Sequence, residues 1–250
     1  PVAVENQVAI LYVASKGKLD DVPTPRVSEF ESGFYAFLER ERPQVLQEIA
    51  KEQALTDSAA NAMVKIAPGI DTDHFAPRAD TQTLRAELGL SEKKVIVSVG
   101  RLVHRKGQDT LVESMPQILS QVPDAHLLFI GEGPYKDYLV KRAAELKVSD
   151  AITFIGRIQY AELPRYICVG DIFAMPSRSR LAGLEVEGLG IVYLEASACG
   201  LAVVGGKSGG APDAVLEGET GFVVDGTSAQ AVAEAVIILL KNPERAIQMG

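Results

Sequence analysis

The chain of 250 residues has no tryptophan, only two cysteines, and no long run of apolar or of basic residues. Cys168 and Cys199 show neither C-x-x-C spacing nor a suitably spaced histidine, which argues against a disulfide framework and against a metal site. A reduced, cytoplasmic setting fits them best. A membrane span needs about 18 successive apolar residues, and a secretory signal needs a charged segment before an apolar core. We therefore expect a chain that is neither membrane-spanning nor secreted.

The charge balance is acidic, with 25 Lys and Arg against 33 Asp and Glu and a formal net charge of -8 at pH 7. No basic run offsets this total, so we expect no nucleic-acid partner, and basic residues that matter must act locally. Because 47% of the residues are hydrophobic, the chain can bury one large core or two small ones.

The first part of the chain, residues 1–57, predicts a small all-α segment. Between residues 24 and 53, apolar residues recur at helical spacing and form one stripe. Such a stripe is more often a core or an interface than a cofactor site, so we assign no chemistry to it. The stripe consists of Val27, Phe30, Phe34, Phe37 and Leu38.

The second part, residues 64–250, alternates short apolar runs with helical patterns, which is typical of an α/β fold. The pattern predicts a Rossmann-like parallel sheet with helices on both faces, whose ligand binds outside the carboxyl ends of the strands. Strands are expected at 93–100, 126–131, 151–156, 171–176, 201–206 and 221–226. Helices are expected at 107–120, 134–145, 161–168, 190–199, 211–216 and 228–240.

Between these parts, residues 58–63 read Ser-Ala-Ala-Asn-Ala-Met, and two interpretations stay open. Small polar and apolar residues suit a natural linker, while the same letters resemble a cloning scar followed by a start codon. In both cases we expect a domain boundary here, with a Rossmann-like domain over 64–250.

A first candidate for chemistry is the stretch "GRLVHRKGQD", which follows the first clear strand. It places Arg101 and Lys106 around a turn that opens a helix at Gly107. Two cations beside a helix start suit a diphosphate, because they neutralise the charge that grows as a phosphate leaves. The alternative is a solvated loop, where Lys and Arg are common.

A second candidate is "VEGLGIVYLEASACG", in which two glutamates stand eight positions apart. Gly188 and Gly190 precede an apolar helical run, and free N–H groups at a helix start can hold phosphate. Glu187 lies in the loop, where its carboxylate could bind sugar hydroxyls. Glu195 lies on the helix, where a carboxylate can accept both hydroxyls of a ribose. The alternative is a pair of surface acids.

The order of these and other motifs carries a family resemblance. "SVGRLVHRKGQD", "FIGEGPY", "ITFIGRI", "DIFAMPS", "EVEGLGIVYLEASACG", "SGGAPDAV" and "GETGFVVDG" follow one another as they do in retaining family 4 glycosyltransferases of the GT-B fold. The resemblance covers the C-terminal nucleotide-sugar domain, about 64–250. "FAMPSRSR" and "EVEGLGIVYLEA" look most like actinobacterial phosphatidylinositol mannosyltransferases.

The resemblance implies GDP or GDP-mannose as the ligand, no required cofactor or metal, and a hexosyl or mannosyl transfer. Arg101 and Lys106 would hold the diphosphate and stabilise the leaving GDP, and Glu187 would contact the sugar. Glu195 would bind the ribose. The base would lie near Arg157 and Ile158, and backbone N–H groups would contact sugar and phosphates at Gly188, Leu189, Gly190 and Ile191.

The resemblance also implies that the acceptor and a catalytic histidine belong to a separate N-terminal α/β domain. We find no G-x-H-like loop and no Gly-rich donor loop of that domain in residues 1–63. We therefore expect a donor-binding half that takes a lipid or glycan acceptor only together with that domain and is inactive alone, since catalysis needs both reactants held together.

Residues 1–57 resemble a different family, the helical C-terminal region of the F-type ATP synthase alpha subunit. That region is a packing element, so no ATPase residue is carried over. Its place beside a glycosyltransferase half indicates a chimera, and the alternative function is therefore an engineered or selected structural chimera without activity of its own.

Overall fold

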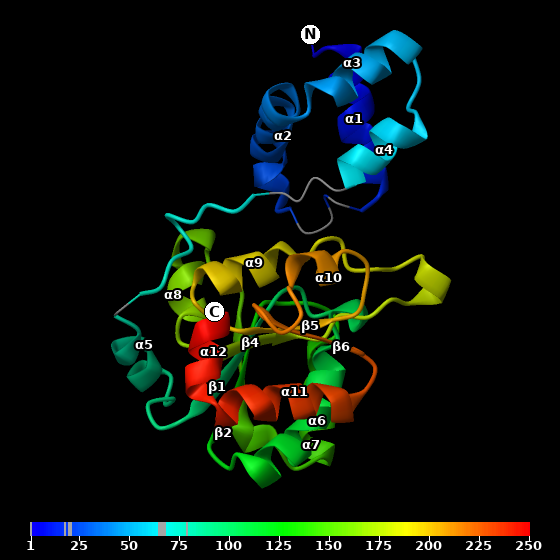
Figure 1. The fold of residues 1–250 in the computed structure, drawn as a ribbon. Helices are drawn as coiled ribbons and strands as arrows, with labels where there is room; N and C mark the ends of the chain where they lie inside the picture. Colours follow the sequence, from blue (N-terminus) through cyan, green and yellow to red (C-terminus); the bar gives the residue numbers. More distant parts are fainter. Residues whose placement is uncertain (1, 18, 20–21, 65–68, 79) are drawn as a thin grey trace. The chain divides into compact units, whose positions relative to one another are not determined.

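The computed structural model describes residues 2–17, 19, 22–78 except 65–68, and 80–250 (Figure 1). The chain divides into two compact units, Pro1–Gly69 and Ile70–Gly250. We call them the helical unit and the α/β unit and describe each by itself.

The helical unit is built from four α-helices and one 3-10 turn among its described residues. One apolar cluster fills it, with Ala9, Leu38 and Ala59 fully buried and Phe34, Val45, Ile49 and Met63 nearly so. The expected stripe therefore contributes Phe34 and Leu38 to the core, while Phe30 packs at its margin. The elements are α1 (Val4–Ser15), η1 (Thr24–Arg26), α2 (Val27–Glu41), α3 (Pro43–Glu52) and α4 (Asp57–Val64).

Helix α4 occupies the residues for which the sequence predicts a linker, 58–63. Thr56 caps this helix, because its hydroxyl oxygen accepts a hydrogen bond from the Ala59 N–H at 3.1 Å. Ala59 and Met63 are spaced four apart, so both point into the core of the helical unit. Tertiary burial thus makes a helix of residues whose small size suggested a linker.

The α/β unit contains one six-stranded parallel sheet in the order β3-β2-β1-β4-β5-β6. This is the doubly wound arrangement, and the predicted fold class is confirmed. Each predicted strand is present within two residues of its expected bounds. The strands are β1 (Lys94–Val99), β2 (Ala125–Ile130), β3 (Ile152–Gly156), β4 (Ile172–Met175), β5 (Val203–Gly206) and β6 (Gly221–Val224).

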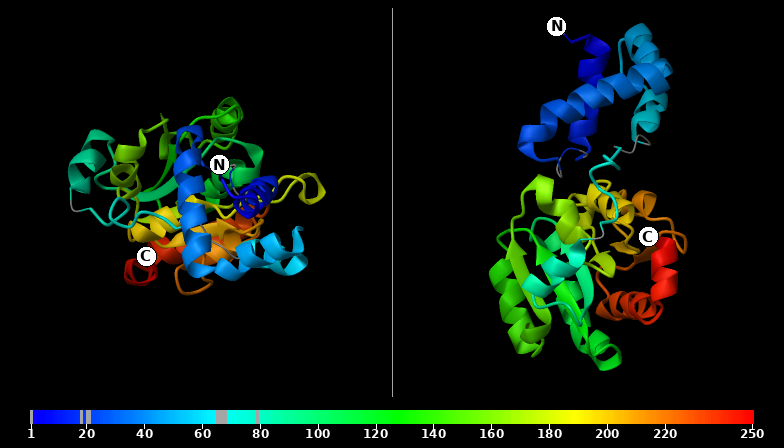
Figure 2. Two further views of the ribbon diagram at one scale, coloured as in Figure 1. Left: turned by 90° about the horizontal axis from the view of Figure 1, so that it is seen from above. Right: turned by 90° about the vertical axis from the view of Figure 1, so that its left-hand side faces the viewer.

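Helices cover both faces of the sheet, as Figures 1 and 2 show. One layer holds α6 (Gln108–Gln121), α7 (Lys136–Glu145), α11 (Ala229–Lys241) and α12 (Pro243–Met249). The other holds α5 (Thr81–Glu87), which the sequence did not predict, with α8 (Leu163–Ile167), α9 (Ile191–Ala198) and α10 (Ala211–Ala214). Short 3-10 turns complete the unit: η2 (His104–Lys106), η3 (Ser149–Ala151), η4 (Tyr160–Glu162) and η5 (Leu181–Gly183).

The central strands are apolar on both faces because each face is covered by helices. In β1, Ile96 packs under α6 and α11, whereas Val95 and Val97 pack on the α9 side. All three side chains are fully buried. This two-sided burial explains why the strand reads as a continuous apolar run instead of an alternating one.

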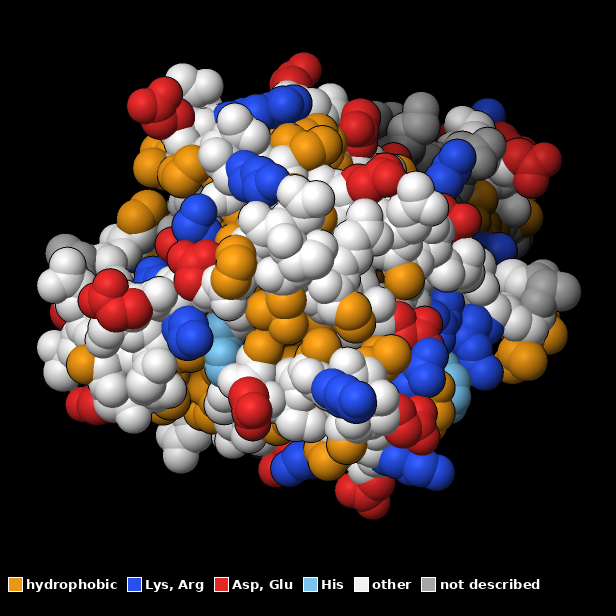
Figure 3. All heavy atoms as spheres, turned by 90° about the horizontal axis from the view of Figure 1, so that it is seen from below, with side chains coloured by type: hydrophobic (Ala, Val, Ile, Leu, Met, Phe, Trp, Pro, Cys, Tyr) orange, Lys and Arg blue, Asp and Glu red, His pale blue; other side chains and the backbone are white. Residues whose placement is uncertain are grey.

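The surface drawn in Figure 3 carries acidic and basic side chains of both signs, interspersed with small apolar areas. No helix among the described residues is long and apolar enough to cross a membrane.

Candidate functional site

The residues predicted to carry chemistry follow the carboxyl ends of the parallel strands, which all meet at one edge of the sheet. From β1 the chain continues to β2 and β3 on one side of β1, and it then returns to form β4 on the other side of β1. The strand order therefore reverses between β1 and β4, and ligands of doubly wound sheets bind at this point.

An ion pair spans this point. The Lys106 ammonium, which follows β1, lies 2.8 Å from Oε1 of Glu187, which follows β4. Both side chains are buried, with 3% and 0% of their surface exposed. Removing two charges from water is costly, and their mutual attraction offsets this only in good geometry. The structure thus brings together two residues that the sequence singled out separately, one for a phosphate and one for a sugar.

The loop that carries Glu187 is held by the turn that follows β5. The Glu187 N–H donates to Oγ of Ser208 at 3.0 Å, and the Gly210 N–H donates to the Gly188 carbonyl at 2.6 Å. A side chain at Gly209 would place its Cβ 1.7 Å from the Glu187 carbonyl oxygen. The glycines of "KSGGAPD" therefore let two backbones approach each other, and they position Glu187.

Helix α9 begins at Gly190, whose φ of 71° lies in the left-handed region. A Cβ on Gly190 would lie 2.4 Å from the Tyr193 ring, so glycine is required here for two reasons. The Tyr193 hydroxyl donates to the Met175 carbonyl at 2.8 Å, and Ser177 Oγ lies 2.8 Å from the Tyr193 hydroxyl oxygen. These contacts attach the start of α9 to the end of β4. Glu195, on the second turn of α9, is 6% exposed.

The other predicted residues lie along the same edge with different exposure. Arg101 follows β1 and is exposed, and its carbonyl accepts a hydrogen bond from Gln108 Nε2 at 3.1 Å. Arg157 follows β3 and is exposed, whereas Ile158 is half-buried against the core on the α9 side. Between Glu187 and α9, Leu189 and Gly190 are buried, and Gly188 and Ile191 are half-buried.

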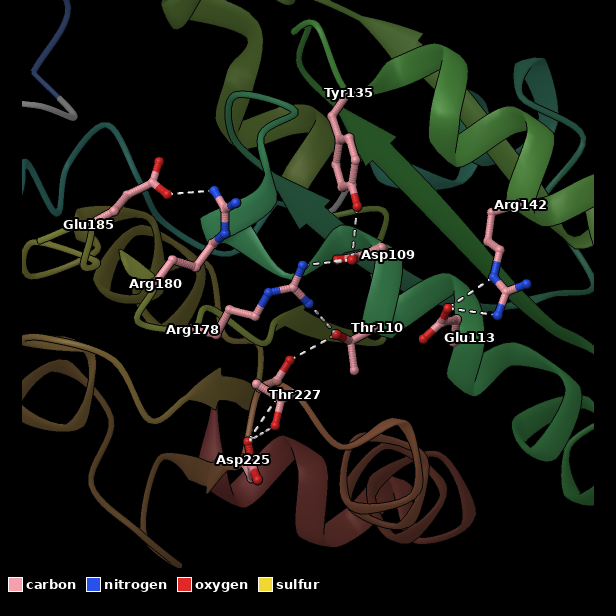
Figure 4. Close-up of polar contacts among 11 residues, drawn as sticks. Asp109, Thr110, Glu113, Tyr135, Arg142, Arg178, Arg180, Glu185, Asp225 and Thr227 are labelled. Carbon is pink, nitrogen blue, oxygen red and sulfur yellow. Dashed lines mark hydrogen bonds and ion pairs between the residues drawn. The ribbon is translucent and has the colours of Figure 1, made fainter. Parts of the chain in front are cut away.

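A second polar cluster, formed by Arg178, Asp109 and Tyr135, was not predicted from the sequence (Figure 4). Arg178 Nη2 lies 2.6 Å from Asp109 Oδ2, and the Tyr135 hydroxyl donates to the same oxygen at 2.9 Å. Burial, together with the hydrogen bond to Asp109, raises the pKa of Tyr135. Arg178 stands in the quoted motif "FAMPSRSR", but nothing local marks Asp109 or Tyr135 as its partners. Within the described part of the chain, no three His, Cys, Asp or Glu side chains are grouped to hold a metal ion.

The charged residues lie at the switch point of a doubly wound sheet, where α/β proteins of this class bind their ligands. Residues 80–250 match the family described as "Glycosyl transferases group 1". This match covers more than half of the chain, and the chain belongs to that family. Residues 1–69 match the ATP synthase alpha/beta chain, C terminal domain. Both resemblances that the sequence motifs carry are confirmed.

Three known proteins illustrate the relationship. The chain is 50% identical over 190 residues to a GDP-mannose-dependent alpha-(1-6)-phosphatidylinositol monomannoside mannosyltransferase of Mycolicibacterium smegmatis, covering 76% of this chain and 50% of that protein. It resembles the structure of HepE from Anabaena in complex with UDP and glucose, with a TM-score of 0.65, 25% identity, and coverage of 74% and 49%. It also resembles the C-terminal domain of a glycosyl transferase group 1 family protein from Francisella tularensis, with a TM-score of 0.63, 26% identity, and coverage of 72% and 92%. The chain spans about half the length of the curated relatives it matches, 50% and 48% in two cases.

Proposed function

We propose that the α/β unit binds a nucleotide sugar, GDP-mannose, as the donor-binding half of a retaining glycosyltransferase that delivers a hexose to a lipid or glycan acceptor. The observation that carries this proposal is the buried Lys106–Glu187 pair at the switch point between β1 and β4. Nucleotides bind at this point in doubly wound folds.

The cations after β1 act on the diphosphate. During transfer the bond between the sugar C1 and the β-phosphate oxygen breaks, the oxygen of the acceptor hydroxyl bonds to C1, and negative charge grows on the departing diphosphate, which takes up the hydroxyl proton. Lys106 and Arg101 stabilise that charge, and a buried ammonium acts strongly because little water screens it. The N–H groups at the start of α9, around Gly190 and Ile191, contribute further donors.

The remaining contacts orient the rest of the donor. Glu187 and the backbone of Gly188 and Leu189 contact the sugar, and Glu195 accepts hydrogen bonds from the ribose hydroxyls. Arg157 and Ile158, at the end of β3, contact the base. GDP is the nucleotide we propose because the Mycolicibacterium relative is described as GDP-mannose-dependent, although HepE was solved with UDP. The experiment must therefore compare both nucleotides.

Donor binding is the activity we propose for these 250 residues alone. Transfer also needs an acceptor held beside the donor. The described residues of the α/β unit supply only the donor side in this proposal. Robust transfer of mannose to a phosphatidylinositol acceptor by the purified 250-residue chain would overturn it.

The test is calorimetric titration of the chain with GDP and with UDP. Arg101→Ala should weaken GDP binding by about 1.5–3 kcal/mol, the contribution of hydrogen bonds to a charged group. Lys141→Ala is the matched control, because Lys141 is an exposed cation on α7. Tighter binding of UDP would exclude a GDP donor. No binding of either nucleotide would exclude the donor-binding function of the chain alone.

A second candidate is a structural chimera with no activity, which the ATP synthase match of residues 1–69 favours. It predicts that the 250-residue chain binds neither GDP nor UDP in the titration described above. Binding of GDP that is weakened in Arg101→Ala would leave no support for this candidate.

A further inference from the structure

Arg178 leaves the end of β4 and reaches the first turn of α6. Its guanidinium nitrogens bond two neighbouring residues there: Nη2 lies 2.6 Å from Asp109 Oδ2, and Nη1 donates to Thr110 Oγ1 at 2.8 Å. The Arg178 and Asp109 side chains are 16% and 13% exposed. Each terminal nitrogen of the guanidinium thus hydrogen-bonds to a different side chain of α6. Arginine can adopt this forked geometry, and lysine cannot.

Further bonds extend this contact to other strand ends, as Figure 4 shows. The Tyr135 hydroxyl, from the loop after β2, donates to Asp109 Oδ2 at 2.9 Å. The Thr110 hydroxyl donates to the Gly226 carbonyl, beyond β6, at 2.8 Å. One network therefore ties together the segments that follow β2, β4 and β6, with the start of α6 at its centre.

The same arginine also holds the loop that carries the phosphate-binding cations. The Arg178 N–H donates to the carbonyl of Arg105 at 2.8 Å, one residue before Lys106. The Arg178 backbone thus bonds the Arg101–Lys106 loop to the segment that follows β4. The Arg178 side chain bonds the same segment to the start of α6, the helix that follows this loop. Burial lowers the pKa of Arg178, but the bond and charge of Asp109 outweigh that effect and raise it overall.

We propose that Arg178 is a positioning residue for the diphosphate: it fixes the Arg101–Lys106 loop and the start of α6 against the end of β4. This inference rests on the proposed function, because it assigns a ligand to that loop. It predicts a loss that is specific to the diphosphate. The residues that we propose to contact the ribose and the base lie on α9 and after β3. None of the Arg178 hydrogen bonds described above involves these segments.

The test compares the binding of GDP and of GMP by calorimetry for Arg178→Lys and Asp109→Asn. Each variant should bind GDP about tenfold more weakly and GMP within about twofold of the parent chain, because a displaced loop loses contact with the second phosphate. Thr110→Val, which removes only the hydroxyl, should change GDP binding in the same direction by less. Arg142→Lys is the control, since Arg142 pairs at 2.8 Å with Glu113, which lies about one turn beyond Asp109 on α6.

Three outcomes would overturn the proposal. Equal losses for GDP and GMP would indicate a general structural role. Unchanged GDP binding in Arg178→Lys would indicate that Arg178 has no role in GDP binding. Stronger or unchanged GDP binding in Asp109→Asn would show that Arg178 binds phosphate directly, because that variant releases its guanidinium. Melting temperatures identify any variant that fails to fold, and Thr110→Val then serves in its place.

A second measurement distinguishes failure of this inference from failure of the proposed function. If the parent chain binds no GDP, the donor-binding proposal fails, but loop positioning is still measurable. Acylation of the buried Lys106 by an amine reagent, followed by mass spectrometry, should be about fivefold faster in Arg178→Lys, since a released loop opens more often. Lys141 is the internal reference, and an unchanged Lys106 rate would overturn the positioning role.

Discussion

The helical unit and the α/β unit bury different kinds of side chain. In the helical unit the described core is apolar, and Asn6 is its buried polar residue. The α/β unit buries Lys106, Asp109, Glu187 and Glu195. Both units meet the same physical requirement of removing apolar surface from water, but among the residues whose burial is described only those of the α/β unit also remove charge from water.

The difference shows where function is to be sought. A buried charge is tolerated only when a partner holds it, so its presence needs an explanation beyond packing. In the α/β unit these charges lie after strand ends at the switch point, where ligands bind. The helical unit is sufficiently explained by packing of amphipathic helices. Four sets of substitutions test this contrast, and hydrogen exchange with mass spectrometry reports the stability of each unit separately.

The largest effect is expected for Lys106→Met. It leaves the Glu187 carboxylate buried without its ammonium partner, which should cost the α/β unit about 3–5 kcal/mol and abolish GDP binding. The control is Lys51→Met in the helical unit, where the ammonium is 81% exposed and the change should be within about 0.5 kcal/mol. Similar small costs at both sites would contradict the contrast.

Leu38→Ala in α2 should destabilise the helical unit by about 3 kcal/mol, because Leu38 is fully buried and a cavity remains. GDP affinity of the α/β unit, measured by calorimetry, should not change. A large loss of GDP affinity would show that the helical unit contributes to the site, and the division of roles would then be wrong.

Substituting alanine for glycine should act with opposite sign in the two units. Gly190→Ala should destabilise the α/β unit by about 2 kcal/mol, through the left-handed backbone and the Tyr193 ring. Gly33→Ala in α2 should stabilise the helical unit by about 0.5–1 kcal/mol, because no atom lies within 4 Å of the added Cβ. Gly89→Ala, with φ of 70° and open space, isolates the backbone contribution. Equal effects of Gly190→Ala and Gly89→Ala would exclude the clash with Tyr193.

The smallest effect is expected for the pH dependence of stability below pH 6.5. All three histidines lie in the α/β unit, and burial, followed by the charge of Lys93, lowers the pKa of His126 below 6.5. The unfolded chain then binds the proton more readily, so His126 lowers stability as the pH falls from 6.5 toward its folded pKa. His126→Gln should remove this slope from the α/β unit, whereas His104→Gln at an exposed position should not. An identical slope in both variants would exclude His126 as its source.

The secondary structure of the α/β unit follows from local sequence. Its six strands are short apolar runs bounded by glycine or proline, and both faces of the sheet demand such runs. Helix α4 escaped prediction because Ala59 and Met63 acquire their role only inside the apolar core of the helical unit. Helix α5 is short, and only its Leu84 is buried, so its pattern is weak.

The amino-acid order thus established a two-part chain, a parallel sheet and a set of individual site candidates, because strand and helix periodicity and turn chemistry are local properties. The pairing of those candidates came from the fold. Lys106 and Glu187, two of those candidates, are 81 residues apart, and Arg178 and Asp109, which the sequence did not predict as a pair, are 69 apart. Their contacts exist because β1 and β4 are neighbours in the sheet although β2 and β3 separate them along the chain. Strand order depends on long-range packing of both helical layers, so no local pattern encodes which charge meets which.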